Sequence, residues 1–191
     1  MPQISLGNEE FGIRSLFTYR PETAYPMCML AEVLLRGPSA LTRGERELIA
    51  TYVSSRNDCG YCTDSHAAAA SAQLPQGMAL VDQVCADLGT APVTPKLAAL
   101  LRIAGAVQQG GKAVREQDVE RAREEGATDL EIHDTVLIAA AFCMYNRYVD
   151  GLATNVRPDA AAYAAASELA VKHGYLAIVG RSAESLQAVQ P

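Results

Sequence analysis

Two cysteines and a histidine near the middle of the chain have the types and spacing needed for thiol chemistry. They lie in the stretch Cys59-Gly60-Tyr61-Cys62-Thr63-Asp64-Ser65-His66. If a helix begins at Cys59, then Cys62 and His66 lie about 300° and 340° around its axis, so the three side chains share one face. Cβ atoms three residues apart are about 5–6 Å apart, so a modest adjustment would allow a disulfide. The spacing predicts a redox pair with a proton carrier beside it.

The position of the pair also favours a reactive thiolate. A thiol in the first turn of a helix faces unsatisfied N–H groups and the positive end of the helix dipole, which stabilise the anion. Glu47 lies in the preceding predicted helix, and packing of the two helices as a hairpin would bring its carboxylate to the cysteines. A thiolate, a proton acceptor and a second thiol are the parts of an activated nucleophile.

Two other interpretations of the same residues remain open. Cys-x-x-Cys with a nearby histidine also suits tetrahedral zinc, and two cysteines on a packed helix can be chemically inert. The other candidate ligands form no second compact pair, so we expect no metal and no cofactor; they are Cys28, Cys85, Cys143, His133 and His173. The three remaining cysteines have apolar neighbours and are expected to be small buried side chains.

Proline and glycine divide the chain into helical segments. We expect an irregular lead-in over residues 1–26 and a C-terminal arm over about 176–191. Between them the pattern predicts helices at about 27–35, 42–56, 59–72, 78–88, 97–108, 116–125, 129–151 and 159–173. Thr42 and Glu45 have the spacing of a capping box, and Asn57-Asp58 is predicted to cap the helix that begins at Cys59. These elements predict a single all-α domain over residues 1–191, with its core at about 20–175.

Composition narrows the class of protein. The chain has 191 residues, 49% of them hydrophobic, which predicts one globular domain. The net charge is −6 and no dense cluster of lysine and arginine is present, so nucleic acid and anionic membranes are unlikely partners. The sequence has neither a signal peptide nor about 18 uninterrupted apolar residues, so we expect a cytoplasmic protein. In a reducing compartment, closely spaced cysteines are more often redox-active or metal-binding than structural.

The full pattern, Glu47-x11-Cys59-x2-Cys62-x3-His66, resembles the active-site signature of the alkylhydroperoxidase D-like (AhpD-like) proteins of the carboxymuconolactone decarboxylase superfamily. Residues 35–42, LRGPSALT, and 145–147, YNR, are similar to its peroxidase-related branch. The resemblance covers residues 20–175. It implies a compact all-α multi-helix fold, with the CxxC at the N-terminus of a helix that follows a Glu-bearing helix, and a homo-oligomer of two, three or six subunits.

The resemblance also implies a thiol-dependent peroxidase of the peroxiredoxin type. Cys62 would be the peroxidatic thiolate, Cys59 the resolving thiol, and Glu47 with His66 the proton relay. Alkylhydroperoxidase D has a relay histidine where this chain has Tyr61, and a phenol with a pKa near 10 is a poor proton shuttle at neutral pH. Decarboxylation is disfavoured because true carboxymuconolactone decarboxylases generally lack the cysteine pair.

The expected partners are a hydroperoxide and a dithiol reductant, of which a lipoyl group is one candidate. Two alternatives use the same cysteines. One is a disulfide or lipoyl-linked oxidoreductase with incidental peroxidase activity, and the other is a non-enzymatic redox-sensing oligomer. Turnover of dihydrolipoamide compared with turnover of peroxide separates the first alternative from the peroxidase. The sensor predicts oxidation of the cysteines with negligible turnover.

Overall fold

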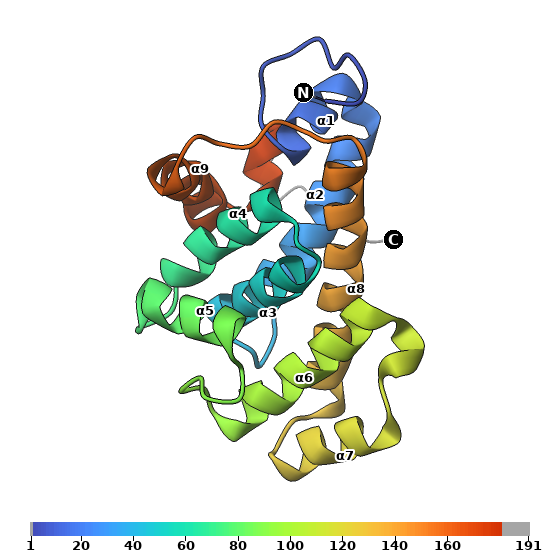
Figure 1. The fold of residues 1–191 in the computed structure, drawn as a ribbon, viewed down its shortest axis with the longest axis vertical. Helices are drawn as coiled ribbons and strands as arrows, with labels where there is room; N and C mark the ends of the chain where they lie inside the picture. The colour runs from blue at the N-terminus through green and yellow to red at the C-terminus, as the bar shows by residue number, and fades with distance from the viewer. Residues whose placement is uncertain (1, 181–191) are drawn as a thin grey trace.

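Every regular element in the described part of the chain, residues 2–180 of a computed structural model, is a helix (Figure 1). The predicted all-α class is therefore confirmed. The α-helices are α1 (Ile13–Tyr19), α2 (Pro21–Arg36), α3 (Arg43–Arg56), α4 (Gly60–Ser71), α5 (Gly77–Ala86), α6 (Pro95–Gln109), α7 (Glu116–Glu124), α8 (Asp129–Gly151) and α9 (Ala160–His173). Two short 3-10 helices are η1 (Gly111–Ala113) and η2 (Tyr175–Val179).

Side-chain caps begin α3 and α8 at the expected residues. The Glu45 backbone N–H donates to Thr42 Oγ1 at 3.2 Å, and the Thr42 N–H donates to the Glu45 carboxylate at 2.8 Å. Thr128 and Glu131 make the same pair of bonds at the start of α8. Each capping box satisfies two N–H groups that the first helical turn leaves without partners, so the start of each helix is set locally.

Helix α3 lies at the centre of the molecule, and its most extensive contacts are with α4 (Figure 1). Leu48, Ile49 and Val53 of α3 are fully buried, in a core shared with Leu100 of α6 and Phe142 of α8. Figure 1 shows α8 running along most of the molecule, with α6 and α7 toward one end and α1 toward the other. Burial on several faces holds α3 and α4 as a rigid hairpin.

The predicted irregular lead-in over residues 1–26 is wrong, because α1 and the first turns of α2 lie within it. Pro21 occupies the first position of α2, where a missing N–H costs nothing. The helix then continues through Pro26, which we had expected to precede it. Packing of Ala24 and Cys28 against Leu176 stabilises this segment, and that contact has no local signature.

The predicted start of the C-terminal arm at residue 176 is also corrected. Leu176 is fully buried in η2, which packs against α2 and α9, so the core extends beyond residue 175. The remainder of the predicted arm, residues 181–191, lies outside the described residues.

The N-terminus of α4 differs from the prediction in its cap. Cys59 itself is the N-cap residue, and no side chain caps the helix. Asp58 precedes it with φ at +58°, and the Asn57 amide points away to Asn146 Oδ1 at 2.8 Å. Cys62 is therefore the third residue of α4, still in the first turn. No described helix is long and apolar enough to span a bilayer.

Candidate active site

The α3–α4 hairpin brings Glu47 and His66 into direct contact. Glu47 Oε2 lies 2.7 Å from His66 Nδ1, and the carboxylate is almost completely buried. The His66 ring meets the Phe142 ring edge-on, with 4.5 Å between ring centroids. A charged acceptor on one side and an aromatic ring on another restrict the orientation of the imidazole. The hairpin packing expected from the sequence is present, but it brings the Glu47 carboxylate to His66, whereas the expected neighbours were the cysteines.

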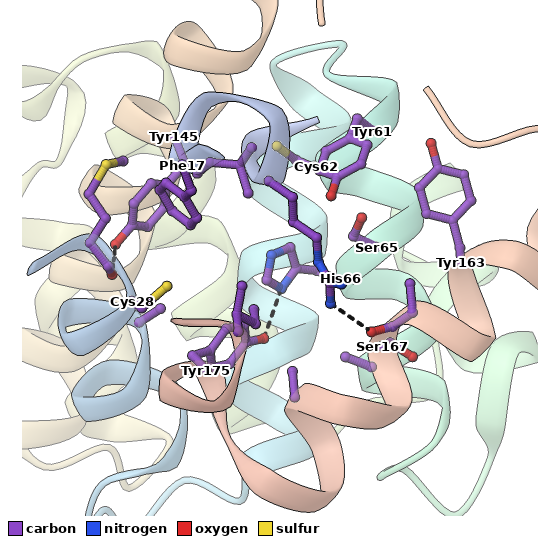
Figure 2. Close-up of a pocket in the computed structure, with 18 of the residues that line it drawn as sticks. Phe17, Cys28, Tyr61, Cys62, Ser65, His66, Tyr145, Tyr163, Ser167 and Tyr175 are labelled. Atoms are coloured by element: carbon purple, nitrogen blue, oxygen red, sulfur yellow. Dashed lines mark hydrogen bonds between the residues drawn. The ribbon is translucent and has the colours of Figure 1, made fainter. Parts of the chain in front are cut away.

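Cys59 and Cys62 occupy different environments although they are three residues apart. Both are free thiols, with exposed fractions of 0% for Cys59 and 4% for Cys62. Cys62 and His66 line a cavity of about 100 Å³, whereas the fully buried Cys59 is not one of its lining residues. Figure 2 shows Cys62, His66 and Tyr175 around this space. A molecule in the cavity can therefore reach Cys62 directly.

The electrostatic environment separates the two thiols further. A hydrogen bond from Cys59 is the largest influence that lowers the pKa of Cys62, and the His66 charge and the Asn146 amide add to it, while burial and Asp150 oppose it. The same sulfur–sulfur contact is the largest cause that raises the pKa of Cys59, and burial raises it further. Cys62 is therefore favoured as the thiolate and Cys59 as the protonated thiol.

Tyr175 joins Glu47 and His66, and the sequence had not identified it as a site residue. Its hydroxyl donates to Glu47 Oε1 at 2.6 Å and lies 3.4 Å from His66 Nδ1 (Figure 2). Its backbone N–H donates to the Glu32 carboxylate at 2.6 Å. Burial raises the pKa of Tyr175 well above its usual value and the Glu47 charge raises it further, so the phenol remains a hydrogen-bond donor.

Asn146 is a second residue that the tertiary structure adds to the site. Its side chain is 1% exposed and donates to Ser54 Oγ at 3.0 Å, while its Oδ1 accepts from Asn57. The amide also reaches the sulfur of Cys62, where it favours the thiolate. The YNR tripeptide was part of the family resemblance, but the sequence did not nominate Asn146 as a site residue.

Tyr61 lies apart from the Glu47–His66 pair. Its ring packs directly over the backbone of Gly12, and the Tyr163 ring lies 5.9 Å away between centroids. Within residues 2–180 it makes no hydrogen bond to Glu47 or His66. Tyr61 therefore forms part of the cavity wall.

The cavity is mostly apolar, and its lining comes from helices far apart in the sequence (Figure 2). The residues that line it are Ile13, Arg14, Phe17, Met27, Cys28, Ala31, Tyr61, Cys62, Ser65, His66, Ala69, Phe142, Tyr145, Arg157, Tyr163, Ala166, Ser167, Ala170, Tyr175 and Ile178.

Among the described residues, no group of three or more His, Cys, Asp or Glu side chains is arranged to hold a metal ion. The zinc interpretation of the sequence would require such a group.

Comparison with known proteins identifies the class to which this fold and site belong. The family model of the carboxymuconolactone decarboxylase family matches residues 21–73, a range that contains Glu47, both cysteines and His66. A solved structure of an uncharacterized peroxidase-related protein from Silicibacter sp. TM1040 is 27% identical, with a TM-score of 0.72, over 80% of this chain and 78% of that one.

A second solved structure, the alkylhydroperoxidase AhpD core of an uncharacterized peroxidase-related protein from Ralstonia eutropha JMP134, is similar as well. It is 28% identical, with a TM-score of 0.70, over 76% of each chain. No curated protein matches the chain significantly. The family match over residues 21–73 and the two structures support an AhpD-like protein of the carboxymuconolactone decarboxylase superfamily.

Proposed function

We propose that this protein is a thiol-dependent peroxidase that reduces organic hydroperoxides through Cys59 and Cys62. The observation that carries the proposal is the unequal placement of the two thiols. Cys62 lines the cavity and is favoured as a thiolate, while Cys59 does not line it and is favoured as a protonated thiol. Both similar structures are of proteins described as peroxidase-related.

The proposed reaction has two thiol steps. The Cys62 thiolate attacks the terminal peroxide oxygen, the O–O bond breaks, and Cys62 becomes a sulfenic acid while the alkoxide takes a proton from His66 and leaves as an alcohol. The Cys59 sulfur then attacks the Cys62 sulfur, and its proton leaves with the hydroxyl group as water. A dithiol reductant, for which a lipoyl group is a candidate, supplies two electrons and two protons to restore both thiols.

In this mechanism, Glu47 and Tyr175 act on the histidine. Glu47 holds His66 Nδ1 at 2.7 Å, which leaves Nε2 as the ring nitrogen that exchanges protons with the thiol and the leaving alkoxide. Tyr175 donates to the second oxygen of the same carboxylate and acts as a positioning residue. Tyr61 has no proton-transfer role in this scheme, so the relay consists of His66 with Glu47 behind it.

Mass spectrometry after one equivalent of cumene hydroperoxide tests the proposal. We expect a Cys59–Cys62 disulfide in the wild type and a Cys62 sulfenic acid, trapped by dimedone, in Cys59→Ser. Cys85→Ser is the matched control, because Cys85 lies outside the cavity lining and should not alter either product. The proposal fails if the pair stays reduced while Cys62→Ser consumes peroxide at the wild-type rate.

We also propose that the protein is a homo-oligomer. Leu130, Leu137 and Met144 recur every seven residues along α8, and their exposed fractions are 60%, 38% and 46%. Residues seven apart lie on nearly the same helix face, so they form an exposed apolar stripe suited to a subunit contact. Sedimentation equilibrium measures the assembled mass, and a mass of one chain at micromolar concentration would contradict this proposal.

A further inference from the structure

Two arginines lie in the wall of the Cys62 cavity, and no carboxylate lies there with them. Arg14 of α1 and Arg157 of the segment between α8 and α9 both line the cavity, and none of the lining residues is Asp or Glu. The chain as a whole carries a net charge of −6. Arg14 and Arg157 therefore place positive charge in the cavity wall of an acidic protein. The Glu47 carboxylate lies outside the lining and is already bonded to His66 and Tyr175.

Arg157 has unused hydrogen-bonding capacity inside the structure. Its Nε is buried and has no hydrogen-bond partner, and its guanidinium lies 5.3 Å from the centre of the Phe11 ring. No carboxylate among residues 2–180 lies within ion-pair distance of it. A buried donor left unsatisfied is unfavourable, and an anion in the cavity would supply the missing acceptor.

Arg14 is similarly under-used. The one hydrogen bond of its side chain in the described part of the chain runs from a terminal nitrogen to the Ala166 carbonyl at 3.4 Å, longer than a typical N–H···O bond. Like Arg157, it has no ion-pair partner there. Burial raises the pKa of Tyr61, and the charges of Arg157 and Arg14 both oppose this increase. Both positive charges therefore act on the part of the cavity where Tyr61 adjoins Cys62.

Other arginines in the interior have partners, which distinguishes these two. Arg36 Nε pairs with the Glu32 carboxylate at 3.1 Å and the same guanidinium binds two carbonyls of α9. Arg46 Nε is buried without a partner, as Arg157 Nε is, but a terminal nitrogen of Arg46 donates to the carbonyls of Leu34 and Gly37. Arg14 and Arg157 are thus available to bind a ligand, while the remaining cavity wall is largely apolar.

We infer that the substrate is an organic hydroperoxide that carries a carboxylate, bound by Arg14 and Arg157 while its peroxide group lies at Cys62. This inference rests on the proposed peroxidase function and names its substrate class. The planar guanidinium donors of arginine match the two oxygens of a carboxylate. The apolar wall between the arginines and Cys62 would contact the hydrocarbon body of the same molecule.

A matched pair of hydroperoxides tests the inference kinetically. Cumene hydroperoxide and its para-carboxylate have the same reacting group and differ in charge. We expect the wild type to favour the carboxylate by about tenfold or more in kcat/KM, because a hydrogen bond to a charged group contributes about 1.5–3 kcal/mol. The ratio should fall toward one in Arg14→Gln/Arg157→Gln and stay at the wild-type value in Arg20→Gln, a control at an exposed arginine.

Binding of the stable alcohol products provides a readout that does not need turnover. By calorimetry on the reduced protein, para-carboxy cumyl alcohol should bind about tenfold or more tightly than cumyl alcohol, and the double variant should lose the difference. Equal kcat/KM for the two hydroperoxides together with equal binding of the two alcohols would overturn the inference and leave the peroxidase proposal intact. A binding preference for the carboxylate without reduction of either hydroperoxide would support the anion site and overturn the peroxidase proposal.

Discussion

Cys62 and Cys59 illustrate how neighbouring residues of one type acquire different chemistry. Each is buried, and burial alone raises the pKa of a thiol. At Cys62 the hydrogen bond from Cys59, the His66 charge and the Asn146 amide outweigh burial, so the pKa is lowered. At Cys59 the contact with the Cys62 side chain and burial raise the pKa and outweigh the Cys62 backbone N–H, which lowers it. The direction of attack in the proposed reaction follows from this asymmetry.

Replacing Asn146 tests that balance at the scale of one residue. Because the thiolate is the reactive form, alkylation of Cys62 should rise with pH through a midpoint below about 8.5, the ordinary cysteine value. Asn146→Ala removes a donor to the anion and should raise the midpoint by about one pH unit. Alkylation rate against pH, with peptide mapping to Cys62, measures it.

Asn57→Ala is the matched control, because it removes a partner of Asn146 but leaves the amide that reaches Cys62. An unchanged midpoint in Asn146→Ala, or an equal shift in both variants, would show that the amide does not stabilise the thiolate.

At the scale of elements, α1 is held against α4 by close contact between a glycine and a ring. Gly12 precedes α1 with φ at +53°, and a Cβ built on it would lie 2.0 Å from Tyr61 Cζ. Only glycine fits both the backbone conformation and the space. This contact places Arg14, two residues further along, at the cavity wall.

Gly12→Ala should therefore destabilise the protein by at least about 2 kcal/mol, since backbone strain and overpacking each contribute about 1 kcal/mol or more. Gly7→Ala is a matched control, because Gly7 has φ at +66° and no atom within 4 Å of the added Cβ. Urea unfolding of both variants separates the steric contribution from the backbone contribution. Equal losses of stability would mean that the Tyr61 ring moves aside at no cost.

At the scale of the whole molecule, the C-terminal part of the described chain completes the site. Tyr175 in η2 reaches Glu47 in α3, and the Glu32 carboxylate of α2 holds the Tyr175 backbone N–H. Gly174 is needed at this junction, because a Cβ there would lie 2.5 Å from the Glu32 carboxylate. Three separate segments thus determine the geometry of one carboxylate–histidine pair.

Tyr175→Phe should lower peroxide turnover by about tenfold. A positioned proton-transfer group contributes roughly 100-fold or more to the rate, and the loss of the Tyr175 hydroxyl, which orients the Glu47–His66 pair, should remove part of that contribution. It should also shift the pH profile of kcat/KM, which a purely structural role would not. Tyr145→Phe is the control, because the Tyr145 hydroxyl that it removes donates to the Met27 carbonyl at 3.0 Å and not to Glu47 or His66. Parallel loss of turnover in both variants with unchanged pH profiles would contradict a role for Tyr175 in the relay.

Much of the helical framework was predictable from the sequence because its determinants are local. Capping boxes act over three residues, and the shared face of Cys62 and His66 follows from helix geometry. The prediction that Cys59 shares this face is wrong, because Cys59 is the N-cap residue of α4 and does not line the cavity. The helix hairpin that carries Glu47 toward the cysteine-bearing helix was predictable, whereas the pairing of Glu47 with His66 was implied only by the family resemblance. The redox pair and its neighbours therefore needed no tertiary information to be nominated.

The residues that complete the site depend on tertiary structure, because they are brought together over long separations in sequence. Tyr175 and Glu47 are 128 residues apart, and Arg14 and Arg157 meet the same cavity from opposite ends of the chain. No periodicity or motif links such positions in the sequence. They meet at the site because α1, η2 and the α8–α9 connection pack around the central α3–α4 hairpin. The sequence alone nominated Cys59 and Cys62 as a redox pair, because their spacing is local, and the tertiary structure decided which thiol lines the cavity, because that depends on packing.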